Sequence, residues 1–390
     1  MIVTPLAVHS PRAIQDALRV HGWDAGRAAD AAGGIQPAAF LLSGLDSTVL
    51  ESLVRFGGQL GLDVVTGEDW AVLAGSYARL SALARPWTVP EPLQALAVGI
   101  GMALPPDPML QWRTARAPLQ LERPVLMGIL NITPDSFSDG GRISDAASAL
   151  EHARTLVADG AVVLDVGGES TRPGRTEPVT AAEELRRVVP VIELLARELP
   201  EVLLSVDTVK AQVARAALDA GAAIVNDVSG FRLDPEMPAV VAAAGAGAVL
   251  MHSRGDILEI ASYAHATYPS GVVTEVLGEL RTSIARATEA GVPAANIVVD
   301  PGLGFSKTIP QNMLLLDQLA AFHTLGRPVL VGPSRKRFLA GESNLAPDAR
   351  DGVTATACAL AWSRGARLFR VHDVAAARSA LDLAAAVGAA

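Results

Sequence analysis

The chain has 390 residues and a formal net charge of −9, and half of its residues are apolar while only 4% are aromatic. This composition excludes a disordered chain and is typical of a globular protein with a large aliphatic core, long enough for two domains. The acidic balance disfavours broad binding to nucleic acid or to an anionic membrane surface, so small molecules are the expected ligands.

The first 108 residues predict a small α/β domain. Ala38–Leu42 has the pattern of a buried strand and Leu62–Val65 that of a second strand. Two amphipathic helices are expected from apolar residues at helical spacing, the first through Leu50, Leu53, Val54 and Leu60 and the second through Trp70, Leu73, Tyr77, Leu80 and Leu83. No constellation of polar residues marks a site, so packing, oligomerisation and a second ligand all stay open as the role of this domain.

A proline-rich stretch, Leu104–Pro124, follows this domain. It contains five prolines, so it does not form one continuous helix. We expect a linker at about residues 104–124, with the domain boundary near residue 108. The second domain then spans residues 109–390.

The second domain repeats one unit eight times, in which a short apolar run ends in polar residues and a longer segment with helical period follows. The helical pattern is plain in one segment, at Leu185, Val188, Val189, Ile192, Leu195 and Leu199. The expected strands are Val125–Leu130, Ala161–Val166, Val202–Val206, Ala222–Val225, Ala248–Met251, Ile297–Val299, Pro328–Val331 and Arg367–Val371. Such alternation predicts a parallel sheet, and eight units favour a (β/α)8 TIM barrel over an open sheet.

Polar residues follow every expected strand, where the strand ends of a barrel would face one crevice. They are Asn131, Asp165, Asp207, Asn226 with Asp227, His252, Asp300, Ser334 with Lys336, and Arg370 with His372. Each alone is as well explained by a helix cap or a turn. Eight convergent sites favour a ligand site, because several carboxylates buried together need a ligand or metal to compensate them.

The same strand ends also gather positive charge, although the chain is acidic. The cations are Arg172, Arg335, Lys336, Arg337, Arg370 and His372. They suit a phosphorylated substrate, because guanidinium groups bind phosphate oxygens bidentately; a solvated basic surface is the plainer alternative. Asp207 and Asp300 can each accept two parallel N–H donors, as an amino-pyrimidinone edge would offer, and Asn226 can both donate and accept. The residues therefore indicate a heterocycle site beside an anion clamp.

Seven ordered motifs resemble the dihydropteroate synthase family across residues 109–390. They are MGILNITPDSFSDGG (Met127–Gly141), LDVGGESTRPG (Leu164–Gly174), SVDT (Ser205–Thr208), NDVSG (Asn226–Gly230), DPGLGFSKT (Asp300–Thr308), SRK (Ser334–Lys336) and RVHD (Arg370–Asp373). The fold implied is a pterin-binding TIM barrel, here preceded by the additional α/β domain.

This resemblance implies a transferase that condenses 7,8-dihydropterin-6-ylmethyl diphosphate with 4-aminobenzoate by an SN1-like mechanism. The products would be 7,8-dihydropteroate and diphosphate, a step of folate biosynthesis with which sulfonamides compete. Mg2+ as cofactor and a homodimer are also implied. Two alternatives share the barrel. A pterin-dependent methyltransferase would need no diphosphate clamp, and a non-catalytic pterin-binding barrel would have lost the clamp residues.

The resemblance also implies roles for individual residues. The pterin would be bound by Asp207, Asn226, Asp300 and Lys336. The diphosphate would be surrounded by Asn131, Thr171, Arg172, Arg370 and His372, with Asn131 also binding Mg2+. The aminobenzoate would be met by Phe137, Arg172, Pro173, Phe305 and Lys336. The residues implied in catalysis are Asp135, Arg172 and Lys336, and Asp135 would stabilise the pterin cation electrostatically.

Two positions depart from the family pattern. Arg337 follows Lys336 where many relatives have Ser, and Ser253 stands in MHS where many have a second Met. We expect the first to alter how the aminobenzoate carboxylate is bound and the second to thin an apolar wall of the pterin pocket.

The remaining features predict a cytoplasmic protein without a membrane segment. Cys358 has no partner for an intrachain disulfide and is expected in the core, and the start MIVTPLAVHSPRAIQ lacks a signal-peptide pattern. The longest uncharged run, Met237–Met251, is too short to span a bilayer. A zinc site is not expected, since the seven His residues show no ligand spacing.

Overall fold

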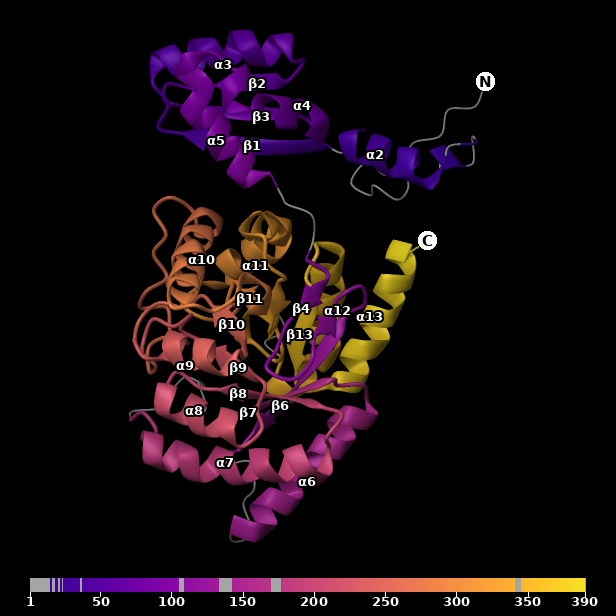
Figure 1. Cartoon of the computed structure of the whole chain (residues 1–390), viewed down its shortest axis with the longest axis vertical. Coiled ribbons are helices and arrows are strands. Elements are labelled where there is room, and N and C mark those ends of the chain that lie inside the picture. Colours follow the sequence, from indigo (N-terminus) through magenta and orange to yellow (C-terminus); the bar gives the residue numbers. More distant parts are fainter. Residues whose placement is uncertain are drawn as a thin grey trace. The chain divides into compact units, whose positions relative to one another are not determined.

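A computed structural model describes residues 15, 18–19, 22, 24–35, 37–104, 109–132, 142–169, 177–340 and 345–389 of the chain. The chain divides into two compact units, Met1–Pro105 and Pro106–Ala390. The first unit contains the elements labelled α2 to α5 in Figure 1, and the second contains β4 to α13.

The first unit is built on a three-stranded antiparallel sheet in the order β1-β3-β2. Its strands are β1 (Pro37–Ser43), β2 (Asp63–Thr66) and β3 (Trp70–Ser76). Its helices are α2 (Ala25–Ile35), α3 (Ser47–Gln59), α4 (Tyr77–Leu83) and α5 (Gln94–Ala103), with the 3-10 turns η1 (Pro86–Thr88) and η2 (Glu91–Leu93). Apolar residues of sheet and helices meet in one core around Leu53, Leu73 and Leu80. The small α/β domain is thus confirmed.

Two predictions for this unit were wrong in part. The helix expected from Trp70 to Leu83 begins only at Tyr77, because Trp70–Ser76 forms the central strand, which pairs with β1 on one side and β2 on the other. The alternating burial of Ala71 and Leu73 is the strand signal that the helical spacing concealed. The strand at Ala38–Leu42 is half-exposed, since β1 lies at the sheet edge and every second residue faces away from the core.

Residues 109–121 form a hairpin rather than a linker. β4 (Gln111–Trp112) pairs antiparallel with β5 (Leu119–Gln120). Trp112 is fully buried, and its indole Nε1 donates to the Asn296 carbonyl oxygen at 2.7 Å. Trp112 and Leu121 pack on the first interior residues of the barrel strands. The second half of the proline-rich stretch therefore closes the barrel at the end where its strands begin, a role that proline spacing does not reveal.

Eight parallel strands form the barrel, in the order β11-β10-β9-β8-β7-β6-β13-β12. They are β6 (Val125–Asn131), β7 (Val163–Gly167), β8 (Leu203–Asp207), β9 (Ile224–Asp227), β10 (Gly247–Met251), β11 (Ile297–Asp300), β12 (Leu330–Val331) and β13 (Leu368–Val371). A parallel bridge between Val299 and Val329 joins the two edges and closes the sheet. The predicted TIM barrel is confirmed.

Helices follow the strands and cover the outside of the barrel (Figure 1). They are α6 (Arg142–Ala158), α7 (Ala181–Glu198), α8 (Ala211–Asp219), α9 (Met237–Ala244), α10 (Val272–Glu289), α11 (Ile309–Asp317), α12 (Asp351–Ser363) and α13 (Val374–Ala389). Short 3-10 turns lie between them, namely η4 (Ala294–Asn296), η5 (Leu319–Leu325), η6 (Arg337–Ala340) and η7 (Pro347–Arg350).

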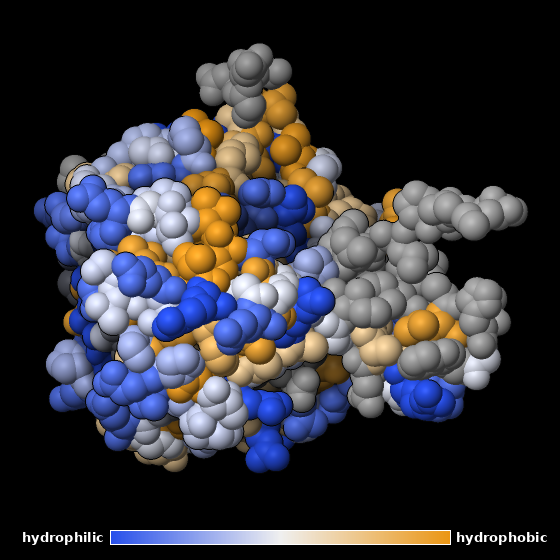
Figure 2. Space-filling view, turned by 90° about the horizontal axis from the view of Figure 1, so that it is seen from above, coloured by the Kyte–Doolittle hydropathy of each residue, from blue (hydrophilic) through white to orange (hydrophobic). Residues whose placement is uncertain are grey.

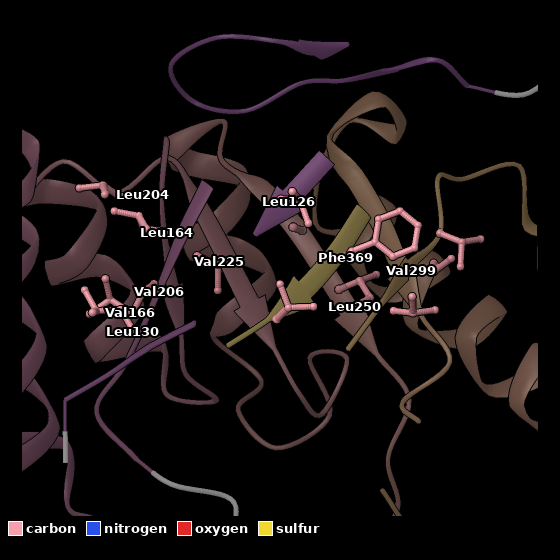
Figure 3. Close-up of a cluster of buried hydrophobic side chains, with 14 of the residues drawn as sticks. Leu126, Leu130, Leu164, Val166, Leu204, Val206, Val225, Leu250, Val299 and Phe369 are labelled. Atoms are coloured by element: carbon pink, nitrogen blue, oxygen red, sulfur yellow. The ribbon is translucent and has the colours of Figure 1, made fainter. Parts of the chain in front are cut away.

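Side chains alternate along each strand between the helical shell and the barrel interior, as the period of two requires. The shell side includes the residues labelled in Figure 3, namely Leu126, Leu130, Leu164, Val166, Leu204, Val206, Val225, Leu250, Val299 and Phe369. The interior side begins with a second apolar cluster, which includes Met127, Val163, Leu203, Ile224, Val249, Val298, Leu330 and Leu368. Both faces of the sheet are therefore buried, as is usual for a parallel sheet.

Charged and apolar residues are interspersed on the surface, as Figure 2 shows for the face seen from above. Some large apolar side chains are exposed, Trp87 and Leu41 most of all. In the described part of the chain, no helix has the length and apolar character needed to cross a membrane.

Replacing Trp112 tests whether the hairpin belongs to the barrel core. Trp112→Ala is expected to lower the free energy of unfolding by about 3–5 kcal/mol, because it opens a cavity and leaves the Asn296 carbonyl without its donor. Urea denaturation followed by circular dichroism measures this. Leu383→Ala, at an exposed position of α13, is the control and should change stability by less than about 0.5 kcal/mol. Equal stability of the two variants would contradict the core role of the hairpin.

Candidate active site

On five barrel strands, an apolar residue of the interior cluster is followed two positions later by a polar residue. The pairs are Val163 and Asp165, Leu203 and Ser205, Ile224 and Asn226, Val298 and Asp300, and Leu368 and Arg370. Because side chains alternate, the second member of each pair also points into the barrel. We call Asp165, Ser205, Asn226, Asp300 and Arg370 the polar interior. It lies between the apolar cluster and the strand ends.

Arg370 connects the carboxylates of this region. Its Nε donates to Asp165 Oδ2 at 2.6 Å, and its Nη2 donates to Asp207 Oδ2 at 2.6 Å. Asn226 Nδ2 donates to the same Asp165 oxygen at 2.9 Å. Burial opposes the charge of Arg370, but Asp165 and Asp207 outweigh it and raise its pKa. One guanidinium thus compensates two carboxylates, which a buried pair requires.

Two of the predicted pterin-binding carboxylates have raised pKa values. Burial raises the pKa of Asp207 to about 7, while Arg370 opposes and Asp165 reinforces the rise. Burial raises the pKa of Asp300 to about 6, opposed first by the backbone N–H of Gly302, which lies 2.7 Å from Asp300 Oδ1. Both groups therefore change charge near neutral pH. N–H donors from a ligand would stabilise their ionised forms.

The polar interior also contains buried oxygen atoms without a hydrogen-bond partner in the described part of the chain. They are Asp165 Oδ1 and Ser205 Oγ. An unsatisfied buried polar atom is costly, and such atoms in a native structure call for an unseen partner such as a ligand or water. The sequence placed Asp165 at a strand end without a role and did not single out Ser205. Their position two residues after an interior apolar residue is the signal that finds them.

A cavity of about 490 Å³ opens above the polar interior. Five predicted site residues line it, namely Asn131, Asp207, Lys336, Arg370 and His372. Ile129, Glu169, Ala261, Gly304, Gly332, Arg335, Arg337, Pro347 and Arg350 line it as well. Asn226 and Asp300 do not line this cavity; they are buried residues of the polar interior. The predicted residues from strands β6, β8, β12 and β13 therefore converge on one space.

Lys336 and Phe305, both predicted to meet the aminobenzoate, lie against each other. The Lys336 ammonium is 3.5 Å from the centre of the Phe305 ring, within range of a cation–π interaction. Gly304 allows this approach, because a Cβ there would come 2.8 Å from Lys336 Cδ. The pKa of Lys336 is lowered to about 7, mainly by burial and also by Arg370, while Asp300 and Asp207 oppose the shift.

The loop after β12 is held by hydrogen bonds of Arg335, Arg350 and His372. Arg335 has a left-handed backbone with φ +57°, and its guanidinium binds Asp351 through two hydrogen bonds of 2.8 Å. Arg350 Nη1 donates to the Arg335 carbonyl oxygen at 2.9 Å. His372 Nδ1 lies 2.9 Å from Ser334 Oγ, which ties β13 to the same loop. The predicted cation Arg335 is therefore committed to the fold.

Glu169, in the second motif, belongs to a buried ion cluster. Lys210 Nζ lies 2.5 Å from Glu169 Oε2 and 2.5 Å from Glu184 Oε2. Glu169 Oε1 accepts from the Val179 backbone N–H at 2.8 Å. The cluster joins the end of β7, the start of α7 and the loop after β8. Glu184 is fully buried on the apolar face of α7, one turn before Val188, and the apolar pattern of this helix did not indicate it.

The structure shows the contacts of the two residues that depart from the family pattern, Arg337 and Ser253. The Arg337 guanidinium lies 4.2 Å from the centre of the Tyr263 ring and lines the cavity. Ser253 Oγ donates to the Val228 carbonyl oxygen at 2.7 Å, so its polar group is satisfied beside Met251 and Val228.

Several predicted site residues lie outside the described part of the chain. They are Asp135, Phe137, Thr171, Arg172 and Pro173. Cys358 is fully buried, and burial raises the pKa of its thiol to about 12, in agreement with the expected core position.

Comparison with known proteins agrees with this geometry. Residues 127–372 match the family model described as pterin binding enzyme. A dihydropteroate synthase of Mycobacterium leprae is 46% identical over 281 residues, which cover 70% of this chain and 94% of the relative. The solved dihydropteroate synthase of Xanthomonas albilineans with 4-aminobenzoic acid is 44% identical, with a TM-score of 0.66 over 72% of this chain and 99% of that one. A Yersinia pestis dihydropteroate synthase solved with a sulfonamide drug is 38% identical, with a TM-score of 0.66 over 72% and 100%.

These matches cover the barrel and all the strands that carry the polar interior. The chain belongs to the pterin binding enzyme family and, within it, to the dihydropteroate synthases, transferases of folate synthesis.

Proposed function

We propose that the barrel performs the dihydropteroate synthase reaction and that a different part of the site binds each part of the substrates. The pterin ring enters the polar interior, the diphosphate lies at the strand ends, and 4-aminobenzoate approaches from the cavity mouth. The observation that supports this most is the convergence of buried carboxylates, buried unsatisfied oxygens and cavity-lining cations in one barrel end. A pterin carries N–H donors for the acids, and its diphosphate carries negative charge for the cations.

Asp207, Asn226, Asp300 and Lys336 would bind the pterin. Asp207 uses Oδ2 for Arg370, which leaves Oδ1 as an acceptor. Asp300 uses Oδ1 for the Gly302 N–H, which leaves Oδ2. Each carboxylate thus has one oxygen that can accept a hydrogen bond from a ligand N–H. These hydrogen bonds are strong only when both carboxylates are ionised.

Asn131, Thr171, Arg172, Arg370 and His372 would surround the diphosphate. Arg370 donates Nε and Nη2 to carboxylates, so Nη1 would serve the diphosphate. Its two hydrogen bonds would also hold the carboxylates of Asp165 and Asp207 in place beside the pterin. Ser334 orients the His372 ring through Nδ1.

Mg2+ is proposed as the cofactor, with Asn131 as a protein ligand. The described part of the chain contains no cluster of three or more His, Cys, Asp or Glu that would hold a metal alone. Mg2+ suits such a site, since it keeps several waters and often binds through one or two protein oxygens and substrate phosphates. Asn131 lines the cavity beside Gly167, where a Cβ would lie 3.6 Å from Asn131 Oδ1. When bound, Mg2+ would stabilise charge on the departing diphosphate.

The reaction would proceed by cleavage of the bond between the pterin methylene carbon and the diphosphate oxygen. The pterin ring delocalises the cation, and Asp135 would stabilise it electrostatically. The amine of 4-aminobenzoate would then form the new C–N bond, and its proton would pass to the departing diphosphate or to solvent. A ring enclosed in the polar interior would be shielded from water before the amine attacks.

Phe137, Arg172, Pro173, Phe305 and Lys336 would bind 4-aminobenzoate, and the packing of Lys336 on Phe305 supports the last two. The relatives solved with 4-aminobenzoic acid and with a sulfonamide support both molecules as ligands of this chain. We also propose that the protein is a cytoplasmic homodimer. Light scattering tests the dimer, and a monomeric mass would contradict it.

Incubation with the pterin diphosphate, 4-aminobenzoate and Mg2+ tests the activity. Formation of dihydropteroate with one diphosphate per turnover is expected. Methyl transfer from a methylated pterin without diphosphate release would instead identify a pterin-dependent methyltransferase, and pterin binding without any turnover would identify a non-catalytic barrel.

Asp300→Asn tests the acceptor role of the buried acids. We expect kcat/KM for the pterin diphosphate to fall by about 10- to 100-fold, since a hydrogen bond to a charged group contributes roughly 1.5–3 kcal/mol. In the wild type, kcat/KM should fall as the pH drops through about 7 to 6, because Asp207 and Asp300 then bind protons. Asp317→Asn, at an exposed position of α11, is the control. A full rate in Asp300→Asn would contradict the role.

Arg337→Ser tests how the aminobenzoate carboxylate is bound. KM for 4-aminobenzoate should rise about 2- to 5-fold, the size of an exposed ion pair, because Arg337 lines the cavity mouth. KM for the uncharged 4-aminobenzamide should not change. Steady-state kinetics on both substrates, with Arg364→Ser as a surface control, measures the difference; equal changes for the acid and the amide would exclude a contact with the carboxylate.

A further inference from the structure

Lys307 is a fully buried lysine that the reaction described above does not use. Its Nζ lies 2.9 Å from His252 Nδ1, 3.0 Å from the Gly302 carbonyl oxygen and 2.9 Å from the Phe305 carbonyl oxygen. The His252 carbonyl oxygen lies farther away, at 3.4 Å. An ammonium has three N–H donors, and these acceptors satisfy all three. Lys307 is thus a satisfied cation inside the protein.

Two acceptors of Lys307, the carbonyl oxygens of Gly302 and Phe305, belong to the turn that positions the predicted ligands of the pterin. This turn runs from Asp300 to Ser306 and contains three left-handed residues, Gly302, Gly304 and Ser306. Gly302 donates its N–H to Asp300 Oδ1, and Phe305 lies under Lys336. A Cβ at Gly302 would come within 2.0 Å of the His252 carbonyl oxygen, so the turn is packed tightly on the β10 loop. Lys307 therefore joins Asp300, through Gly302, to the neighbouring strand end.

A chain of hydrogen bonds leads from Lys307 to the outside of the barrel. His252 Nε2 lies 3.0 Å from Glu279 Oε2 on α10. If Nδ1 accepts from Lys307, the imidazole is neutral and Nε2–H donates to Glu279. This agrees with burial and Lys307, which lower the pKa of His252 to about 4. Glu279 also pairs with Arg254, which stacks on Tyr268.

Groups of both charges act on Lys307 and on Asp300. Burial lowers the pKa of Lys307 to about 7, Asp300 and Glu279 raise it, and Arg254 and Lys336 lower it. For Asp300, burial raises the pKa, while Gly302 N–H, Lys307, Lys336 and Arg370 lower it. Loss of the Lys307 charge would therefore favour protonation of Asp300. A merely structural lysine would hold the turn without affecting this titration.

We propose that Lys307 is a positioning residue for pterin recognition. Its buried ammonium fixes the Asp300–Ser306 turn and keeps Asp300 ionised. Glu279, nearer the surface, stabilises this ammonium. The inference rests on the proposed binding of the pterin by Asp300. It predicts that pterin affinity depends on pH through two residues that do not touch the ligand.

Binding of 6-hydroxymethylpterin, measured by calorimetry between pH 5 and 9, tests the proposal without turnover. Lys307→Gln keeps N–H donors but removes the charge. The fall in affinity on the acid side of the pH profile, the acid limb, should therefore shift to higher pH by roughly one unit. Glu279→Gln should move the alkaline limb to lower pH, because Lys307 then loses its proton sooner. Glu289→Gln, an exposed change on the same helix, is the matched control and should move neither limb.

The ligand's own titration is common to all variants and cancels in their comparison. A folded Lys307→Gln with the wild-type acid limb would overturn the proposal. If that variant does not fold, Glu279→Gln decides, and an unchanged alkaline limb overturns it. If the wild-type protein turns over the pterin diphosphate and both variants bind the pterin with the wild-type pH dependence, only this inference is refuted. Wild-type protein that does not bind the pterin refutes the proposed function and this inference with it.

Discussion

The barrel end depends on one constraint, the compensation of carboxylates that are buried inside a closed sheet. Asp165 is fully buried, and burial raises the pKa values of Asp207 and Asp300. Arg370 binds two of these acids, and Lys307 and Lys336 act on the third. Such an arrangement costs desolvation energy, which hydrogen bonds only partly offset. The unsatisfied oxygens of Asp165 and Ser205 mark where a ligand would complete the compensation.

Much of the fold followed from the sequence because the barrel repeats one local rule. Each strand is a short apolar run and each helix has an apolar stripe, so eight units were readable in order. The N-terminal unit lacks this redundancy. Trp70–Ser76 has apolar residues that fit both periods, and only its pairing with two strands decided the outcome. The burial of Trp112 likewise depends on residues far along the chain, such as Asn296.

Of the residues that the sequence placed at strand ends, Asn131, Asp207, Lys336 and His372 line one cavity in the structure, and their roles there stay predictions. The sequence did not indicate which residues act through a partner that is distant in the chain. Arg370 was expected to bind diphosphate, yet its hydrogen bonds go to Asp165 and Asp207. Lys307 lies within a motif, but its contact with His252 joins it to another strand end. Glu184 is a charged residue buried on the apolar face of α7, one turn before Val188.

A crystal structure of the complex with pteroic acid would show which ligand atoms contact the buried acids. We expect the pterin ring inside the barrel, with its N–H groups within hydrogen-bond distance of Asp207 and Asp300 and with Arg370 still bound to Asp165. A ring bound at the rim, with the polar interior unchanged, would contradict it.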